Sequence, residues 1–111
     1  MAAFSTERDG DLLIVAVEGQ LVVGNRAEFK QLVFDQLEDG ARRVLIDFSG
    51  TAYIDSSGLG ALVSLGKRIR DEGGALHLTG LNEDLRTLFE LTRLDTLFQL
   101  FDRRADALAA F

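Results

Sequence analysis

Two short apolar runs constrain the fold of this 111-residue chain more than any other feature. Residues 12–17 read Leu-Leu-Ile-Val-Ala-Val and residues 44–48 read Val-Leu-Ile-Asp-Phe, so both are nearly continuous in apolar side chains. A strand that is covered on both faces has this pattern, whereas a strand with one wet face alternates. We therefore predict a sheet with central strands buried on both sides, in a single domain spanning residues 1–111.

Strand and helix patterns alternate along the rest of the chain. The predicted strands span residues 4–8, 11–18, 44–48, 75–79 and 98–101. The predicted helices begin near Asn25, Ser57, Asn82 and Asp102, and the first two end near residues 39 and 71. Strands that alternate with helices are joined by right-handed parallel crossovers, while Asp9-Gly10 makes the first pair a hairpin. The sequence predicts the α/β class, with a mixed, mostly parallel sheet of four to five strands and about four helices.

Side-chain orientation is predicted at two places. Alternation over residues 75–79 places Leu76 and Leu78 on one face of the strand and His77 and Thr79 on the other. His77, the only histidine, is interpreted as solvent-facing, and no acid stands at a spacing typical of a catalytic triad. The contact face of the last helix, with Asp102 as its cap, is expected to contain Ala105, Leu108 and Ala109.

Charge and composition exclude several classes of partner. The chain has 12 Lys and Arg against 18 Asp and Glu, a formal charge of -6, and no basic stripe. Nucleic acid and anionic membranes are therefore poor partners. The absence of cysteine excludes disulfides, zinc–thiolate sites and thiol catalysis. No secretory signal is recognised, and no apolar stretch approaches the roughly 18 residues that span a bilayer. We expect a cytoplasmic protein with no direct membrane insertion.

The segment over residues 53–60 places two hydroxyls at the start of a predicted helix. Unpaired N–H groups and the helix dipole tolerate negative charge there, so phosphoserine at Ser56 or Ser57 is compatible with the fold. A simpler interpretation, which the local pattern by itself favours, is that one of these serines is only an N-cap. We expect Ser56 to project from the loop before the helix, and the Ser57 hydroxyl to accept a backbone N–H in the first turn.

Other chemistry has little support in the sequence. Gly58-x-Gly60 lacks the Lys-Ser or Lys-Thr of a P-loop and the third glycine of a dinucleotide fingerprint. The acidic pairs near residues 9–11 and 83–84 are spaced like turn and first-turn helix residues. We therefore predict no metal site, no cofactor and no enzymatic activity.

Five pieces of sequence, in this order, resemble the STAS domain of bacterial anti-sigma factor antagonists over essentially the whole chain. They are Val17-Glu18-Gly19-Gln20-Leu21, Val44-Leu45-Ile46-Asp47-Phe48, Asp55-Ser56-Ser57-Gly58-Leu59-Gly60, Gly73-Gly74 and Leu88-Phe89-Glu90-Leu91. The predicted order of strands and helices also resembles this domain. The resemblance implies a signalling module that acts by binding partners.

A partner switch is what this resemblance implies. In that family the unphosphorylated antagonist binds a serine kinase that is also the anti-sigma factor, and the sigma factor is released. The kinase inactivates the antagonist by phosphorylating the first hydroxyl residue after the motif's Asp, which is Ser56 here. A metal-dependent serine/threonine phosphatase reverses the modification. The free antagonist is expected to be a monomer.

The expected partner surface comprises the loop after the second strand and the helix that follows the serines. Its residues are Val22, Val23, Asn25, Asp55, Ser56, Ser57, Gly58, Leu59, Ser64 and Arg68.

The chain departs from the family pattern at one point in this surface. Phosphorylated members commonly carry a Gly-x-Leu-Asp pattern, and this chain has Gly19-Gln20-Leu21-Val22. This departure indicates a divergent partner or a STAS protein that is not phosphorylated. Two alternative functions stay open: a non-phosphorylated STAS accessory subunit of a membrane transport complex, and a small-molecule-sensing STAS module that uses the loop at the strand ends as its pocket.

Overall fold

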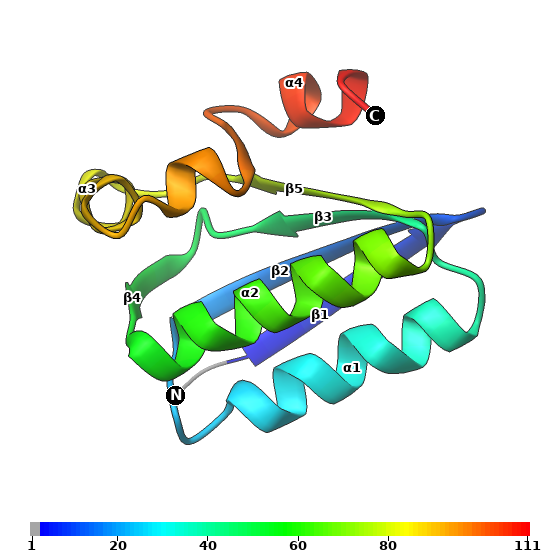
Figure 1. Cartoon of the computed structure of the whole chain (residues 1–111), viewed down its shortest axis with the longest axis horizontal. Coiled ribbons are helices and arrows are strands. Elements are labelled where there is room, and N and C mark those ends of the chain that lie inside the picture. The colour runs from blue at the N-terminus through cyan, green and yellow to red at the C-terminus, as the bar shows by residue number, and fades with distance from the viewer. Residues whose placement is uncertain (1–2) are drawn as a thin grey trace.

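The computed structural model describes residues 3–111, which form a sheet with helices on both faces (Figure 1). The strands are β1 (Ala3–Asp9), β2 (Leu12–Leu21), β3 (Arg43–Asp47), β4 (Thr51–Ile54), β5 (Ala75–Thr79) and β6 (Gln99–Phe101). The α-helices are α1 (Arg26–Glu38), α2 (Ser56–Asp71), α3 (Glu83–Leu91) and α4 (Arg104–Ala109), and a 3₁₀ turn, η1, spans Leu94–Thr96. The predicted α/β class is confirmed.

The sheet is mixed and mostly parallel, as predicted. Its strand order is β1-β2-β3-β5-β6, and β4 pairs with β2 outside this path. Only β1 and β2 are antiparallel among the described pairs. The turn that joins them is Gly10 and Asp11, one residue later than predicted, because Asp9 still pairs with Leu12. In Figure 1, α1 and α2 lie side by side on one face, and α4 lies over the opposite face.

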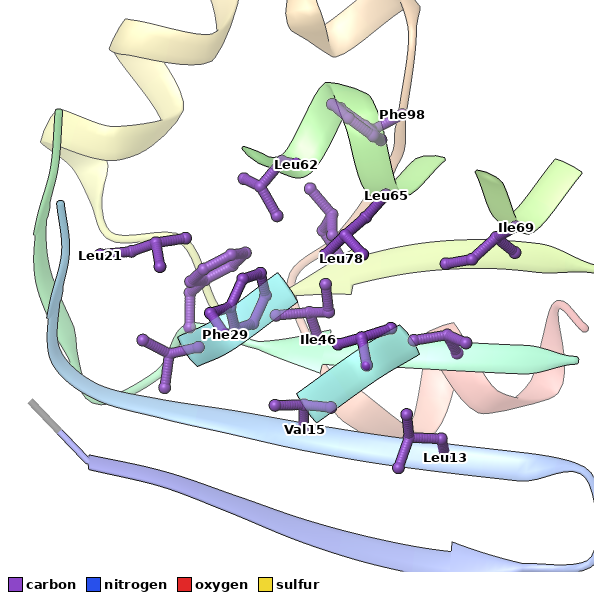
Figure 2. Packing of buried hydrophobic residues seen from close by; sticks show 14 of the residues in the cluster. Leu13, Val15, Leu21, Phe29, Ile46, Leu62, Leu65, Ile69, Leu78 and Phe98 are labelled. Carbon is purple, nitrogen blue, oxygen red and sulfur yellow. The ribbon is translucent and has the colours of Figure 1, made fainter. Parts of the chain in front are cut away.

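The two apolar runs form β2 and β3 at the centre of the sheet, which confirms their burial on both faces. Val15 of β2 stands opposite Ile46 of β3, and both side chains enter the core beneath α1 and α2 (Figure 2). The intervening residues Ile14 and Leu45 point to the other face and pack with Ala107 of α4. A central strand can be apolar throughout because each face supplies its own core.

β4 is a strand that the sequence analysis missed. The second strand, predicted to end at residue 18, continues as β2 to Leu21 and pairs there with β4. The ladder shifts register between Gly19 and Gln20. Thr51 and Ile54 are the buried residues of β4, and the Thr51 hydroxyl donates to the Val17 carbonyl. Four residues with two exposed in the middle carry too little periodicity to predict a strand.

His77 is buried, so its predicted exposure is wrong. Its side chain is 2% exposed, and Nδ1 lies 2.9 Å from the Ala107 carbonyl, which accepts a hydrogen bond from the ring N–H. The ring stacks on Phe111 with centroids 3.9 Å apart. His77 does face away from Leu78, as alternation predicted, but α4 covers that face of the sheet. Strand periodicity sets a side and cannot show what lies over it.

The start and the contact face of α4 also differ from prediction. Asp102 accepts a bond from Arg86 instead of capping the helix, and Arg103 holds the N-cap position. Ala107 is fully buried and Leu108 half-buried, whereas the predicted contact residues Ala105 and Ala109 are exposed. A helix of six residues contacts the sheet through too few positions for a periodic face to be read from sequence.

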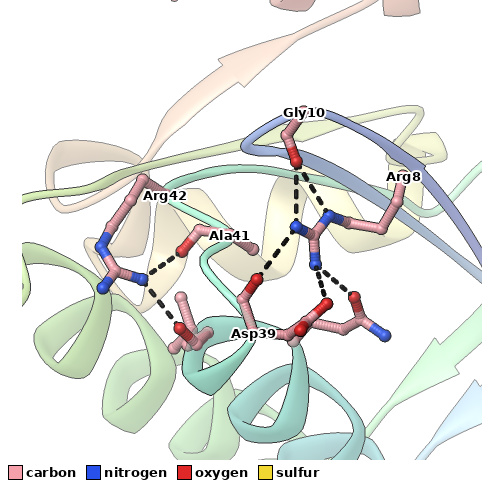
Figure 3. Close-up of polar contacts among 7 residues, drawn as sticks. Arg8, Gly10, Asp39, Ala41 and Arg42 are labelled. Carbon is pink, nitrogen blue, oxygen red and sulfur yellow. Dashed lines mark hydrogen bonds and ion pairs between the residues drawn. The ribbon is translucent and has the colours of Figure 1, made fainter.

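Polar contacts attach α1 and α4 to the sheet. The Arg8 guanidinium donates to the Gly10 carbonyl and to Gln36 Oε1 and pairs with Asp39, which joins the hairpin to the end of α1 (Figure 3). On the other face, Arg104 Nη2 lies 2.8 Å from Asp47 Oδ2.

None of the helices described over residues 3–111 is both long and apolar enough to cross a bilayer.

Replacing Ile46 with Asp is expected to unfold the protein. Ile46 is fully buried in β3, and an unpaired charge there costs several kcal/mol, a large part of the stability of a domain this size. Thermal melting checks this, with Ile46→Val as the matched control, which is expected to cost only about 1 kcal/mol. A melting temperature for Ile46→Asp within about 2 °C of wild type would contradict the burial of this strand.

Asp47 is expected to make folding pH-dependent. Burial opposes its ionisation, but hydrogen bonds from Ser49 and Arg104 outweigh burial and lower its pKa in the folded state. Its stabilising contribution is therefore complete above the unfolded pKa of about 3.9 and is lost as pH falls through the lower folded pKa. Asp47→Asn is expected to lower stability at neutral pH and to flatten its decline between about pH 5 and pH 2.

Denaturant unfolding at a series of pH values measures this effect. Asp9→Asn, which removes an exposed carboxylate from the end of β1, is the control and is expected to preserve the wild-type slope. An unchanged slope in Asp47→Asn would show that ionised Asp47, bonded by Ser49 and Arg104, does not contribute to the pH dependence.

Candidate functional site

Asp55 joins the start of α2 to the loop that follows β2. Its Oδ1 accepts a bond of 2.8 Å from the Gly58 N–H, and its Oδ2 accepts one of 3.1 Å from the Val23 N–H. Asp55 is therefore the N-cap of α2, and the predicted capping role of Ser56 or Ser57 is wrong. A carboxylate accepts a first-turn N–H as a serine hydroxyl does, and its negative charge also complements the helix dipole.

Both serines lie within α2. Ser56 is the first residue of the helix, so the prediction that it precedes the helix is wrong. Its side chain is exposed. Ser57 is half-buried, and neither hydroxyl makes a side-chain hydrogen bond with any of residues 3–111, which contradicts the predicted Ser57 bond. Because Asp55 already satisfies the Gly58 N–H, the hydroxyl of Ser56 is free to react with an approaching group.

The electrostatics of the site are dominated by ionised Asp55. The Gly58 N–H lowers its pKa most, partial desolvation opposes this, and the Val23 and Ser57 N–H groups and the charge of Arg26 lower the pKa further. Ser56 therefore stands beside a fixed negative charge at neutral pH. Three or more His, Asp or Glu side chains do not cluster as metal ligands anywhere in residues 3–111.

Asn25 holds the loop after β2 and does not cap α1 with its side chain. Its Oδ1 accepts a bond of 2.8 Å from the Val22 N–H, and its Nδ2 donates to the Gln20 carbonyl at 2.9 Å. Val22 is half-buried, while Val23 is 65% exposed. The loop thus presents Val23 next to Asp55, and both belong to the predicted partner surface.

Gly58 and Leu59 lie under the site, not on its surface. Gly58 is buried, and a Cβ atom at this position would overlap the Leu21 carbonyl of β2. Leu59 is half-buried and packs against the core. These residues position the start of α2, and Ser56 and Val23 are exposed above them.

Ser64 and Arg68 lie farther along α2, on the side next to α1. They follow Ser56 by eight and twelve residues, which is about 12 and 18 Å along a helix axis. The Arg68 guanidinium lies 4.7 Å from the centre of the Phe34 ring of α1 and pairs with Glu72. The predicted surface therefore divides into a serine loop, defined by Val22, Val23, Asp55, Ser56 and Ser57, and a seam between α1 and α2.

Two features beside the serine loop were missed by the sequence analysis. Tyr53 of β4 is 56% exposed, two residues before Asp55. A groove of about 460 Å³ runs between α1 and α2, with Arg26, Lys30 and Gly60 in its lining. A prediction of β4 as a strand would have placed apolar Ile54 inward and the adjacent Tyr53 outward. The groove has no signal in the sequence, because its two walls, α1 and α2, are distant in the chain.

The chain belongs to the STAS domain family, whose model matches residues 3–107. BtrV of Bordetella bronchiseptica, named as a candidate anti-sigma factor antagonist, is 30% identical over 100 residues, or 90% of this chain and 86% of the relative. The anti-sigma-B factor antagonist of Staphylococcus aureus is 29% identical over 86 residues, or 78% and 80% of the two chains. A crystal structure from Thermotoga maritima, likewise named a candidate antagonist, has a TM-score of 0.91 and 30% identity, covering 96% and 92% of the two chains.

More distant structures share the fold alone. The phosphorylated form of SpoIIAA from Bacillus superposes with a TM-score of 0.76 at 15% identity. A sulfate transporter family protein from Wolinella succinogenes superposes with a TM-score of 0.80 at 20% identity. The fold therefore accommodates more than one named role, and function must be argued from the site.

Two glycines of α2 are expected to respond oppositely to the same substitution. Gly58→Ala places a Cβ against the Leu21 carbonyl and is expected to cost about 1–3 kcal/mol. Gly60→Ala, one half-turn away, meets open space and is expected to stabilise by about 0.5–1 kcal/mol through helix propensity. Chemical denaturation measures both variants, and equal effects would contradict the close approach of α2 to β2.

Proposed function

We propose that this chain is an anti-sigma factor antagonist that binds an anti-sigma factor serine kinase and is switched off by phosphorylation of Ser56. The observation that carries the proposal is the exposed first residue of α2, Ser56, next to a capping carboxylate. The names of the Bordetella and Staphylococcus relatives support the same role. In this proposal the chain is a binding module and not an enzyme.

Phosphorylation at Ser56 would change charge without disturbing the fold. Phosphate adds a charge of about -1.5 to -2 at an exposed position where the helix dipole favours negative charge. The same charge, added to that of Asp55, would repel an acidic partner and raise the desolvation cost of an interface. A hundredfold loss of affinity requires only about 2.7 kcal/mol, which one phosphate in an interface can supply.

The partner surface in this proposal combines the serine loop with the exposed side of α2. Val23 and Ser56 supply exposed contacts at the loop, and Ser64 and Arg68 extend the surface along the α1–α2 seam. A metal-dependent serine/threonine phosphatase would restore the binding form. The free protein would be a cytoplasmic monomer.

Val22 keeps the transport-accessory alternative open. The family resemblance places an acid at this position in phosphorylated members, and here the side chain is a half-buried valine. The proposed kinase must therefore recognise the loop without that carboxylate, and Asp55 is the acid that stands beside Ser56. The absence of phosphate on either serine would favour the accessory role in a transport complex.

Ser56 is expected to be the residue that a cognate kinase phosphorylates, because it is the more exposed of the two hydroxyls. Mass spectrometry after incubation with kinase, ATP and magnesium locates the phosphate. Ser56→Ala is expected to remain in the binding form, and Ser56→Asp to bind about 100-fold more weakly while melting near wild type.

The matched controls use the neighbouring serine. Ser57→Ala is expected to be phosphorylated normally, and Ser57→Asp to bind more tightly than Ser56→Asp. Phosphate on Ser57, or equal loss of binding in the two Asp variants, would contradict the assignment. Binding is measured by titration calorimetry with the purified kinase, so that folding and affinity are followed separately.

A further inference from the structure

The groove between α1 and α2 is cationic where it meets the start of these helices. Arg26 is the first residue of α1, and Lys30 follows it one turn later; both line the groove. Figure 1 shows that α1 and α2 begin at the same end of the pair. The whole chain has a formal charge of -6, so two neighbouring cations on one groove contrast with its general charge.

Neither cation forms an ion pair within the described part of the chain. The ion pairs found over residues 3–111 involve other arginines and Lys67. Lys30 Nζ lies 5.7 Å from the centre of the Phe34 ring, and Arg26 is exposed. Both side chains are therefore available to an anion at the groove.

Ser56 stands beside this end of the groove. Ser56 and Gly60 are one helical turn apart on α2, so they share a face of the helix, and Gly60 lines the groove together with Arg26. Gly60 has no side chain that could separate Ser56 from Arg26, and the space that a Cβ atom would occupy at position 60 is open. The charge of Arg26 also reaches Asp55, where it lowers the pKa after the hydrogen bonds from Gly58 and Val23.

We propose that Arg26 binds the phosphate of phosphorylated Ser56 within the same chain, with Lys30 adding a second positive charge. This inference deepens the proposed function and rests on it, because the phosphate on Ser56 is its ligand. A guanidinium suits phosphate because its fork of N–H donors matches two phosphate oxygens. The negative charge of Asp55 opposes the phosphate, and the two cations offset that repulsion.

This pairing would give phosphorylation a second effect on binding. Repulsion by phosphate acts only on acidic groups of a partner. Pairing with Arg26 would also occupy the cationic end of the groove and make it unavailable to those same groups. The switched-off form would thus differ from the binding form at both the serine loop and the groove.

The test uses the full chain with phosphoserine installed at position 56 during synthesis, so it requires neither kinase nor partner. A ³¹P NMR titration measures the second pKa of the phosphate. A nearby guanidinium stabilises the dianion, so Arg26→Gln is expected to raise this pKa by about 0.5 unit. Lys30→Gln is expected to raise it less. Arg70→Gln, which removes an exposed cation from the last turn of α2, is the matched control and is expected to leave it unchanged.

The outcomes separate this inference from the proposed function. Equal phosphate pKa values in wild type and Arg26→Gln, or an equal rise in Arg70→Gln, would overturn the pairing while leaving kinase recognition of Ser56 unaffected. The expected shift together with no kinase-dependent phosphate on Ser56 would support the pairing and contradict the proposed function alone. Because Arg26 is exposed, thermal melting of Arg26→Gln is expected to match wild type and so exclude misfolding as the cause.

Discussion

The close approach of α2 to the end of β2 is the constraint on which the rest of the site depends. Gly58 brings the first turn of the helix against the Leu21 carbonyl, where any side chain would collide. Asp55 then reaches both the helix start and the Val23 N–H of the facing loop. Backbone from two distant segments is held together by one carboxylate, and Ser56 is left exposed on a rigid support.

The sheet holds the start of α2 in place because both faces of the sheet are packed. On one face α1 and α2 cover Val15 and Ile46, and on the other α4 is held by the Asp47–Arg104 pair and by the His77 contact with Ala107. Neither layer can move without exposing apolar surface, which costs about 25 cal/mol per Å². A module that must present one loop in a constant geometry benefits from this two-sided packing.

A rigid support suits a switch that works by charge. The serine loop sits above a capped helix whose first-turn Gly58 N–H is already satisfied, so adding phosphate to Ser56 need not rearrange the backbone. Phosphorylation instead changes the electrostatic potential at the surface, where Asp55 is negative and Arg26 and Lys30 make the α1–α2 groove positive. In the proposed function the partner responds directly to this charge, because Ser56 is exposed. Val23 beside it offers the partner an apolar contact.

The sequence by itself determined the fold class, the central strands and the long helices, because a strand covered on both faces and an amphipathic helix each leave a periodic signal. It also identified Asp55 and Ser56 as neighbours at a helix start. Only the tertiary structure decided that Asp55 is the cap, that His77 is buried and that β2 extends to meet β4. Each depends on contacts between distant segments: Asp55 bonds a loop 32 residues earlier, and His77 a helix 30 residues later. The local pattern of apolar residues cannot predict these long-range contacts, because they form only when the helices and the sheet pack together.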